Sequence, residues 1–197
     1  MRMTTPQQPD IARDLLNRAT AARLHHSRLT RGQLNPAEIA AGRHQDHANA
    51  GMLRRVTAEH GWPGRRLVGE DGAQAAYLIA LYADHDPDLQ NAMLRLLGGA
   101  VDSGQAPAGH WAHLHDRWCI NSGQAQLHGT QYVRGPAGVE VAPVREPQHL
   151  DTLRARAGLP PHATAAEAVR RRYPPTRHAD PPSDAGPPEM VLVKWAA

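Results

Sequence analysis

The chain has 197 residues, of which 41% are hydrophobic, and this predicts one core in a single domain with a loose tail. The formal net charge of +3 rests on cations that are nearly all arginine, and no basic cluster is interleaved with aromatic residues, so we expect no nucleic-acid partner. The single cysteine excludes an internal disulfide framework, and no apolar run approaches the roughly 20 residues that span a bilayer, so we expect a cytoplasmic protein without a membrane partner.

Two helices are predicted in the N-terminal third. Asp10 can cap a helix over residues 11–29. The Asn-Pro pair at residues 35–36 is a clearer start signal, because asparagine is a favoured N-cap and proline suits the first helical turn. The second helix is expected to run to about His60, with Gly61 as its C-cap.

Three further helices are predicted in the middle of the chain. The first covers about residues 72–83. Asp86 followed by Pro87 repeats the cap-and-proline signal and predicts a helix to about residue 101. Pro107 opens another, which is expected to end near residue 121.

Beyond the five helices, the pattern changes to short β-prone segments. Residues 126–134 and 139–144 flank a Gly/Pro-rich turn and predict a hairpin. Short helices are expected at about 147–157 and 164–173.

The expected fold is mainly α, with about five packed helices, a small C-terminal β-hairpin and a disordered Pro-rich tail. The domain boundaries are a disordered N-terminus over 1–9, a single helical domain over 10–173 with the hairpin near 126–144, and a flexible tail over 174–197. Within this tail, residues 174–189 are almost free of apolar side chains and indicate a linker. The terminal Met190–Trp195 segment is apolar and either docks as an edge strand or stays loose.

Polar residues fall on or near the predicted apolar faces of three helices. Burying an unpaired polar group costs about 1–3 kcal/mol, so these residues are expected to bond to one another, to backbone or to a ligand. Two interpretations stay open: a functional pocket against the hairpin, or a structural cluster that fixes helix register. The residues are Asp46, Asn49, His60, Asp71, Tyr82 and Gln90.

The fifth helix carries a His-x-x-His-x-His-Asp sequence over residues 110–116, which resembles a metal motif. A helical wheel places Trp111 and Leu114 on the core face, whereas His113 and Asp116 lie on the opposite side. Side chains that do not converge cannot share an ion. We therefore predict no metal and no cofactor.

A set of motifs then occurs in a fixed order: Asp46-x-x-Asn49, Gly61-Trp62-Pro63, Ala83-Asp84-x-Asp86 with Gln90, Asp116-Arg117, and Gln126-x-x-Gly129-Thr130-Gln131. Together they resemble a bacterial family catalogued as domain of unknown function 6624, which is common in actinomycetes and other bacteria. The resemblance covers roughly residues 40–160. It implies no established activity.

This chain departs from the family pattern at two positions. Tyr82 stands where the family usually has histidine, and His128 stands where it usually has tyrosine. The reciprocal exchange suggests that the two side chains are neighbours. It also makes His128 the candidate to inherit any role of the family's histidine.

The first functional hypothesis is a metal-independent acid/base enzyme acting on a small molecule or peptide. His60 or His128 would act as general base or acid, and Asp46 or Asp84 would orient the imidazole. Arg117 would bind a substrate carboxylate or stabilise negative charge, and could neutralise Asp46 or Asp71. The remaining ligand-binding candidates are Asn49, Trp62, Tyr82, Gln90 and Gln131.

The second hypothesis is a non-catalytic protein-binding or accessory module. The same polar residues would then be structural, and the arginine-rich helix faces would be the contact surface. The residue pattern leaves the choice between the two hypotheses, and the oligomeric state, open.

Overall fold

The computed structural model describes residues 6–135, 138–173 and 190–192, and it confirms a mainly α fold. Five long helices come first: α1 (Pro9–Thr30), α2 (Pro36–His60), α3 (Arg65–Leu81), α4 (Pro87–Asp102) and α5 (Ala108–Asn121). The shorter elements that follow are β1 (Gln131–Gly135), β2 (Gly138–Val141), a 3-10 turn (Pro147–His149), α6 (Leu150–Arg156), α7 (His162–Arg172) and β3 (Met190–Leu192).

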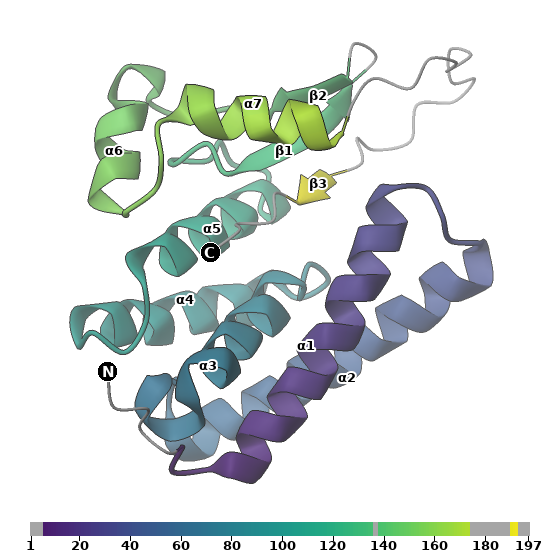
Figure 1. The fold of residues 1–197 in the computed structure, drawn as a ribbon, viewed down its shortest axis with the longest axis vertical. Coiled ribbons are helices and arrows are strands. Elements are labelled where there is room, and N and C mark those ends of the chain that lie inside the picture. Colours follow the sequence, from purple (N-terminus) through teal and green to yellow (C-terminus); the bar gives the residue numbers. More distant parts are fainter. Residues whose placement is uncertain (1–5, 136–137, 174–189, 193–197) are drawn as a thin grey trace.

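The long helices build the main core, and the strands with α6 and α7 form a smaller layer against α5 (Figure 1). The most extensive helix contact is between α1 and α3, where small side chains such as Ala12, Ala19 and Ala76 are buried. Helices with alanine at their contact faces can approach closely, which compensates for the absence of phenylalanine in the core.

The local start and stop signals at Asn35, Gly61 and Asp86 are confirmed. The backbone N–H of Glu38 donates to Asn35 Oδ1 over 2.9 Å, and the Glu38 carboxylate accepts from the Asn35 N–H over 2.8 Å, forming a complete capping box. At the other end of α2, Gly61 has φ 71°, where a residue with a Cβ would be strained. Asp86 Oδ1 caps α4 by accepting from the Leu89 N–H over 2.9 Å.

Two N-terminal predictions were wrong. Asp10 does not cap α1, because the helix already begins at Pro9 and Gln8 occupies the N-cap position. The predicted disordered N-terminus over 1–9 is also ordered in part. The N–H groups of Gln7 and Gln8 donate to the carbonyls of Arg66 and Leu67 over 3.3 and 2.8 Å, while residues 1–5 lie outside the described part of the chain.

The third helix begins at Arg65 rather than near residue 72. A first turn forms immediately after Gly64, and the helix then kinks at Gly69, whose φ is 76°. Because Gly69 interrupts the helical pattern in the sequence, the hydrophobic periodicity did not predict the first turn of α3. The kinked segment exposes Asp71 instead of aligning it with the core, contrary to the helical-wheel prediction.

The predicted hairpin forms, but its strands are shorter than expected. Tyr132 faces Val141 and Gly135 faces Gly138 in an antiparallel register. Residues 126–130 form a loop instead of extending β1. The C-terminal segment docks as the edge strand β3 on the other side of β1, while residues 174–189 and 193–195 lie outside the described residues.

Across the described residues, none of the helices combines the length and apolarity needed to cross a membrane.

Two glycine-to-alanine substitutions test how tightly the α3 region is packed. A Cβ at Gly72 would lie 2.8 Å from Val68 Cβ and 3.4 Å from Ala12 Cβ, so Gly72→Ala should lower the free energy of unfolding by about 1 kcal/mol or more. Gly99 in α4 meets no atom within 4 Å, so Gly99→Ala should raise it by about 0.5–1 kcal/mol through helix propensity. Urea denaturation of both variants measures the difference. Equal effects would contradict the packing argument.

Candidate functional site

Arg117 of α5 pairs with Asp84, which follows α3. Its Nε donates to Asp84 Oδ1 over 2.6 Å and its Nη2 donates to Oδ2, while the Arg117 side chain is only 4% exposed. Burial by itself would raise the pKa of Asp84, but the charge and hydrogen bonds of Arg117 outweigh it and hold that pKa below its ordinary value. The partner of Arg117 is thus Asp84, rather than Asp46 or Asp71 as expected.

Amide side chains extend this ion pair. Asn121, which the sequence reasoning missed, donates through Nδ2 to Asp84 Oδ1 and to Gln90 Oε1, each over 2.9 Å. Gln90 in turn donates to the carbonyls of Ala80 and Leu81. Gln90 is fully buried as predicted, and its hydrogen bonds to the protein tie α3, α4 and α5 together.

A separate cluster surrounds Asp46. Asp46 Oδ2 lies 2.9 Å from Nε2 of His26, and the His26 ring stacks on Tyr82 with centroids 4.1 Å apart. Asp46 therefore orients a histidine, but the histidine is on α1 and was not among the candidates. Burial raises the pKa of Tyr82 to about 12. The nearby Asn49 is also buried, and its Oδ1 accepts from Gln45 over 2.9 Å.

The structure does not bring His60 and Trp62 into either cluster. The His60 imidazole lies at the end of α2, 3.4 Å from the exposed carboxylate of the adjacent Glu59. The Trp62 ring packs against the main hydrophobic core. Tyr82 and His128 also share no hydrogen bond or ring contact among the described residues, so the reciprocal exchange gains no support as a neighbour relationship.

The buried carboxylate of Asp116 organises the loop over residues 126–130. It accepts from the backbone N–H groups of Leu127, His128 and Thr130 over 2.9–3.1 Å, and from the Thr130 hydroxyl over 2.9 Å. Although burial opposes ionisation, hydrogen bonds from His115 and His128 hold the pKa of Asp116 far below its ordinary value. Asp116 is therefore an ionised acceptor.

The helical-wheel argument for α5 was wrong about Asp116 and His113. Both were placed on the side away from the core, yet they are 0% and 6% exposed. The reason is that α5 is covered twice: the main core contacts one face, and the 126–130 loop with the α6 region contacts the other. Ala112, which packs with Ala157 and Leu159, marks this second buried face.

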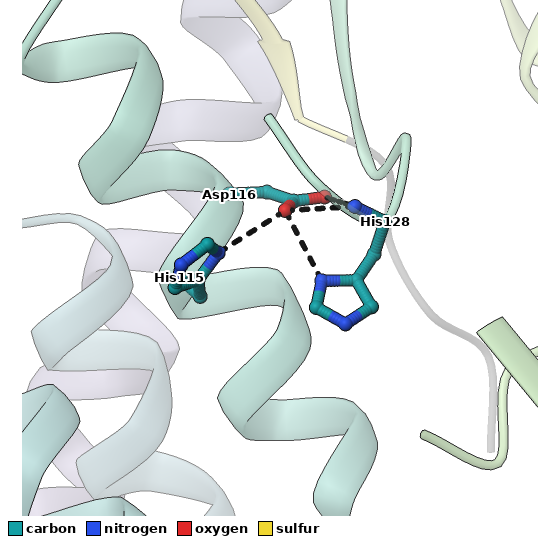
Figure 2. Close-up of side chains that lie close together, drawn as sticks. All are labelled: His115, Asp116 and His128. Carbon is teal, nitrogen blue, oxygen red and sulfur yellow. Dashed lines mark hydrogen bonds and ion pairs between the residues drawn. The ribbon is translucent and has the colours of Figure 1, made fainter. Parts of the chain in front are cut away.

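The imidazole of His128 is fixed by the same carboxylate. Its Nδ1 lies 3.2 Å from Asp116 Oδ1, and Figure 2 shows the His128 and His115 rings on two sides of Asp116. Because an ionised carboxylate only accepts, the proton in this bond belongs to Nδ1. Arg154 Nη1 donates to the His128 carbonyl over 2.7 Å and anchors the backbone. His128 Nε2 makes no hydrogen bond within the described part of the chain.

His128 lines a cavity of about 410 Å³ between α4, α5 and α6. This volume lies within the range of small-molecule sites. The apolar lining includes Val101, Trp111 and Leu153, and the Trp111 ring meets the His128 ring edge-on with centroids 6.0 Å apart. Of the sequence-predicted catalytic residues, His128 is the one placed at this cavity, whereas Asp46, His60 and Asp84 lie outside its lining.

His115, Asp116 and His128 also have the geometry to be considered as metal ligands, because their donor atoms lie within 4.8 Å of one another. Each Asp116 oxygen already accepts protein donors, however: Oδ1 from the Leu127 N–H and Oδ2 from the Thr130 N–H and hydroxyl. An ion would have to displace or share these lone pairs. The arrangement therefore fits a hydrogen-bonded His-Asp dyad better than a metal centre.

A family model described as "Family of unknown function (DUF6624)" matches residues 9–173. No curated protein and no solved structure matches the chain. The matched range contains both buried clusters, the 126–130 loop and every residue that lines the cavity.

Removing the Asp116 carboxylate should destabilise the protein strongly. Asp116→Ala leaves three backbone N–H groups and one hydroxyl without their acceptor, so the free energy of unfolding should fall by roughly 3–5 kcal/mol. Asp71→Ala, which removes an exposed carboxylate, should change it by no more than about 0.5 kcal/mol. Denaturant titration of both variants checks the contrast, and a small effect at Asp116 would contradict its organising role.

Stability should also fall as the pH drops from 6.5 towards 4. Burial lowers the pKa of His110 and of His113 to about 4, so the unfolded chain binds more protons than the folded one over this interval. His110→Gln should therefore flatten the slope of unfolding free energy against pH by up to about 1.4 kcal/mol per pH unit. Denaturant titrations of both proteins at pH 8 supply the control. At this pH the histidine is neutral in the folded and the unfolded chain, so a difference in unfolding free energy reflects the lost stacking on Tyr77 and not proton binding. An unchanged slope would refute the assignment.

Proposed function

The chain belongs to the DUF6624 family of unknown function, and within that family we propose that it is a metal-independent acid/base enzyme acting on a small molecule or peptide. The observation that carries the proposal is the position of His128: a buried histidine, held by an ionised carboxylate, lines a cavity of ligand size. Carboxylate-oriented imidazoles beside a cavity are suited to proton transfer.

The division of roles follows from the hydrogen bonds. Asp116 accepts the Nδ1–H, which leaves Nε2 as the basic nitrogen of His128. A substrate in the cavity would transfer its proton to Nε2, and the negative Asp116 would stabilise the imidazolium that forms. His128 is thus the proposed catalytic residue, and Asp116 is a positioning residue.

The other predicted residues support this dyad indirectly. Arg117 Nη1 donates to Gln131 Oε1 over 3.4 Å, Gln131 Nε2 donates to the Thr130 hydroxyl over 3.0 Å, and that hydroxyl donates to Asp116. The chain of bonds leads from Asp84 to the dyad. We assign Asp84 and Arg117 to holding the loop in place rather than to binding substrate.

One observation favours the alternative, a non-catalytic protein-binding or accessory module. Gln90, Gln126 and Gln131 are fully or almost fully buried, and each makes several hydrogen bonds within the protein. A polar network satisfied in this way fixes helix register without any ligand. The two functions are distinguished by whether His128 is needed for turnover.

The test is an activity panel of chromogenic esters, amino-acid anilides and lactones, run on the full chain after dialysis against EDTA. The wild type should turn over at least one class, and His128→Gln should lower kcat by about 10²–10⁴-fold while circular dichroism shows that the variant is still folded. Replacement of the exposed His149 by Gln is the matched control and should leave kcat unchanged.

Three results would count against the enzyme. Full activity of His128→Gln would show that His128 is not the catalytic residue. If EDTA abolishes activity and zinc or another divalent ion restores it, the site is a metal centre. Failure of the wild type on every class would favour the non-catalytic module.

A further inference from the structure

The cavity beside His128 carries one positive and one negative side chain. Arg156 and Asp102 both line it, and both are exposed at its edge. Neither side chain makes a hydrogen bond or an ion pair with another of the described residues, including with each other. Two opposite charges that share one cavity without pairing are available to a ligand.

The position of Asp102 is not explained by helix stability. It is the last residue of α4, where the helix dipole presents negative charge and a carboxylate is disfavoured. Arg156 is the last residue of α6, where the dipole favours a cation. The unfavourable placement of Asp102 at the cavity suggests that it recognises a positive group.

Apart from these two residues and His128, the side chains that line the cavity are apolar. Val101, Ala108, Trp111 and Leu153 contribute to its lining, and the Trp111 indole also stacks on His115 with ring centroids 4.8 Å apart. Such a lining suits an aliphatic or aromatic side chain and gains from burying it. The lining therefore combines an anion-binding group, a cation-binding group and an apolar pocket.

We propose that this cavity binds a zwitterionic amino acid or a close derivative with an apolar side chain. Its carboxylate would pair with Arg156, its ammonium group with Asp102, and its side chain would lie against Trp111. The guanidinium is suited to a carboxylate because it can donate two parallel hydrogen bonds. This inference rests on the proposed function in placing the ligand next to Nε2 of His128.

The test compares three probes by calorimetry: L-phenylalanine, N-acetyl-L-phenylalanine without the ammonium charge, and L-phenylalaninamide without the carboxylate. The wild type should bind phenylalanine at least about tenfold more tightly than either derivative. Arg156→Gln should weaken phenylalanine and the N-acetyl derivative but not the amide. Asp102→Asn should weaken phenylalanine and the amide but not the N-acetyl derivative.

The decisive result is this crossed pattern, in which each variant weakens a different derivative of phenylalanine. A general loss of folding would not produce it, because both variants replace exposed residues and should keep the wild-type Tm. Arg145→Gln, an exposed arginine outside the cavity lining, is the control and should leave all affinities unchanged. Equal binding of the three probes, no binding of phenylalanine, or equal weakening of all probes by both variants would overturn the proposal.

The outcomes separate this inference from the proposed enzyme. His128→Gln should retain phenylalanine binding, since the imidazole holds neither charge of the ligand. Crossed binding without turnover of any substrate would uphold the zwitterion site and reject the enzyme. Turnover of neutral esters by a wild type that does not bind phenylalanine would uphold the enzyme and reject the zwitterion site.

Discussion

The smaller layer of the protein depends on one buried carboxylate. Asp116 comes from the middle of α5 and holds the 126–130 loop through backbone N–H groups, not through side-chain packing. A buried charge is costly unless hydrogen bonds compensate for it, and here the loop itself supplies the donors. Because β1 follows this loop directly, the hydrogen bonds of Asp116 also fix the position of β1. The position of the sheet therefore depends on α5, which precedes it in sequence.

The two layers are connected by polar groups and not only by apolar contact. The ion pair between Arg117 and Asp84 links α5 to the end of α3, and Gln131 continues the network into β1. Hydrogen bonds are directional, so they restrict the layers to one relative placement more sharply than alanine packing can. This explains why a chain poor in large aromatic residues still forms a defined site at the junction.

Helix ends could be predicted from the sequence because a cap is a local interaction. Asn35, Gly61 and Asp86 act on residues three or four positions away, and their effects do not depend on the tertiary fold. The burial of Asp116 could not be predicted in this way, because the helical wheel assumes one buried face per helix. Ala112, a small residue on the supposedly exposed face, was the one local hint of a second contact.

At the candidate site, too, individual residues could be chosen from the sequence, but their partners in the fold could not. His128 was singled out through the family resemblance, but its orienting carboxylate was sought at Asp46 or Asp84. Asp46 instead faces His26 and Asp84 faces Arg117, since partners separated by 20 and 33 positions are chosen by helix packing. Residue type therefore singled out candidate residues, while only the fold could assign the pairs.

The loop around His128 has a consequence for substitutions at this position. Its shape is set by main-chain atoms: the amide of residue 128 bonds to Asp116, and its carbonyl bonds to Arg154. Neither bond depends on which side chain residue 128 carries. A substitution at position 128 can therefore change the group that faces the cavity while these two main-chain bonds stay the same.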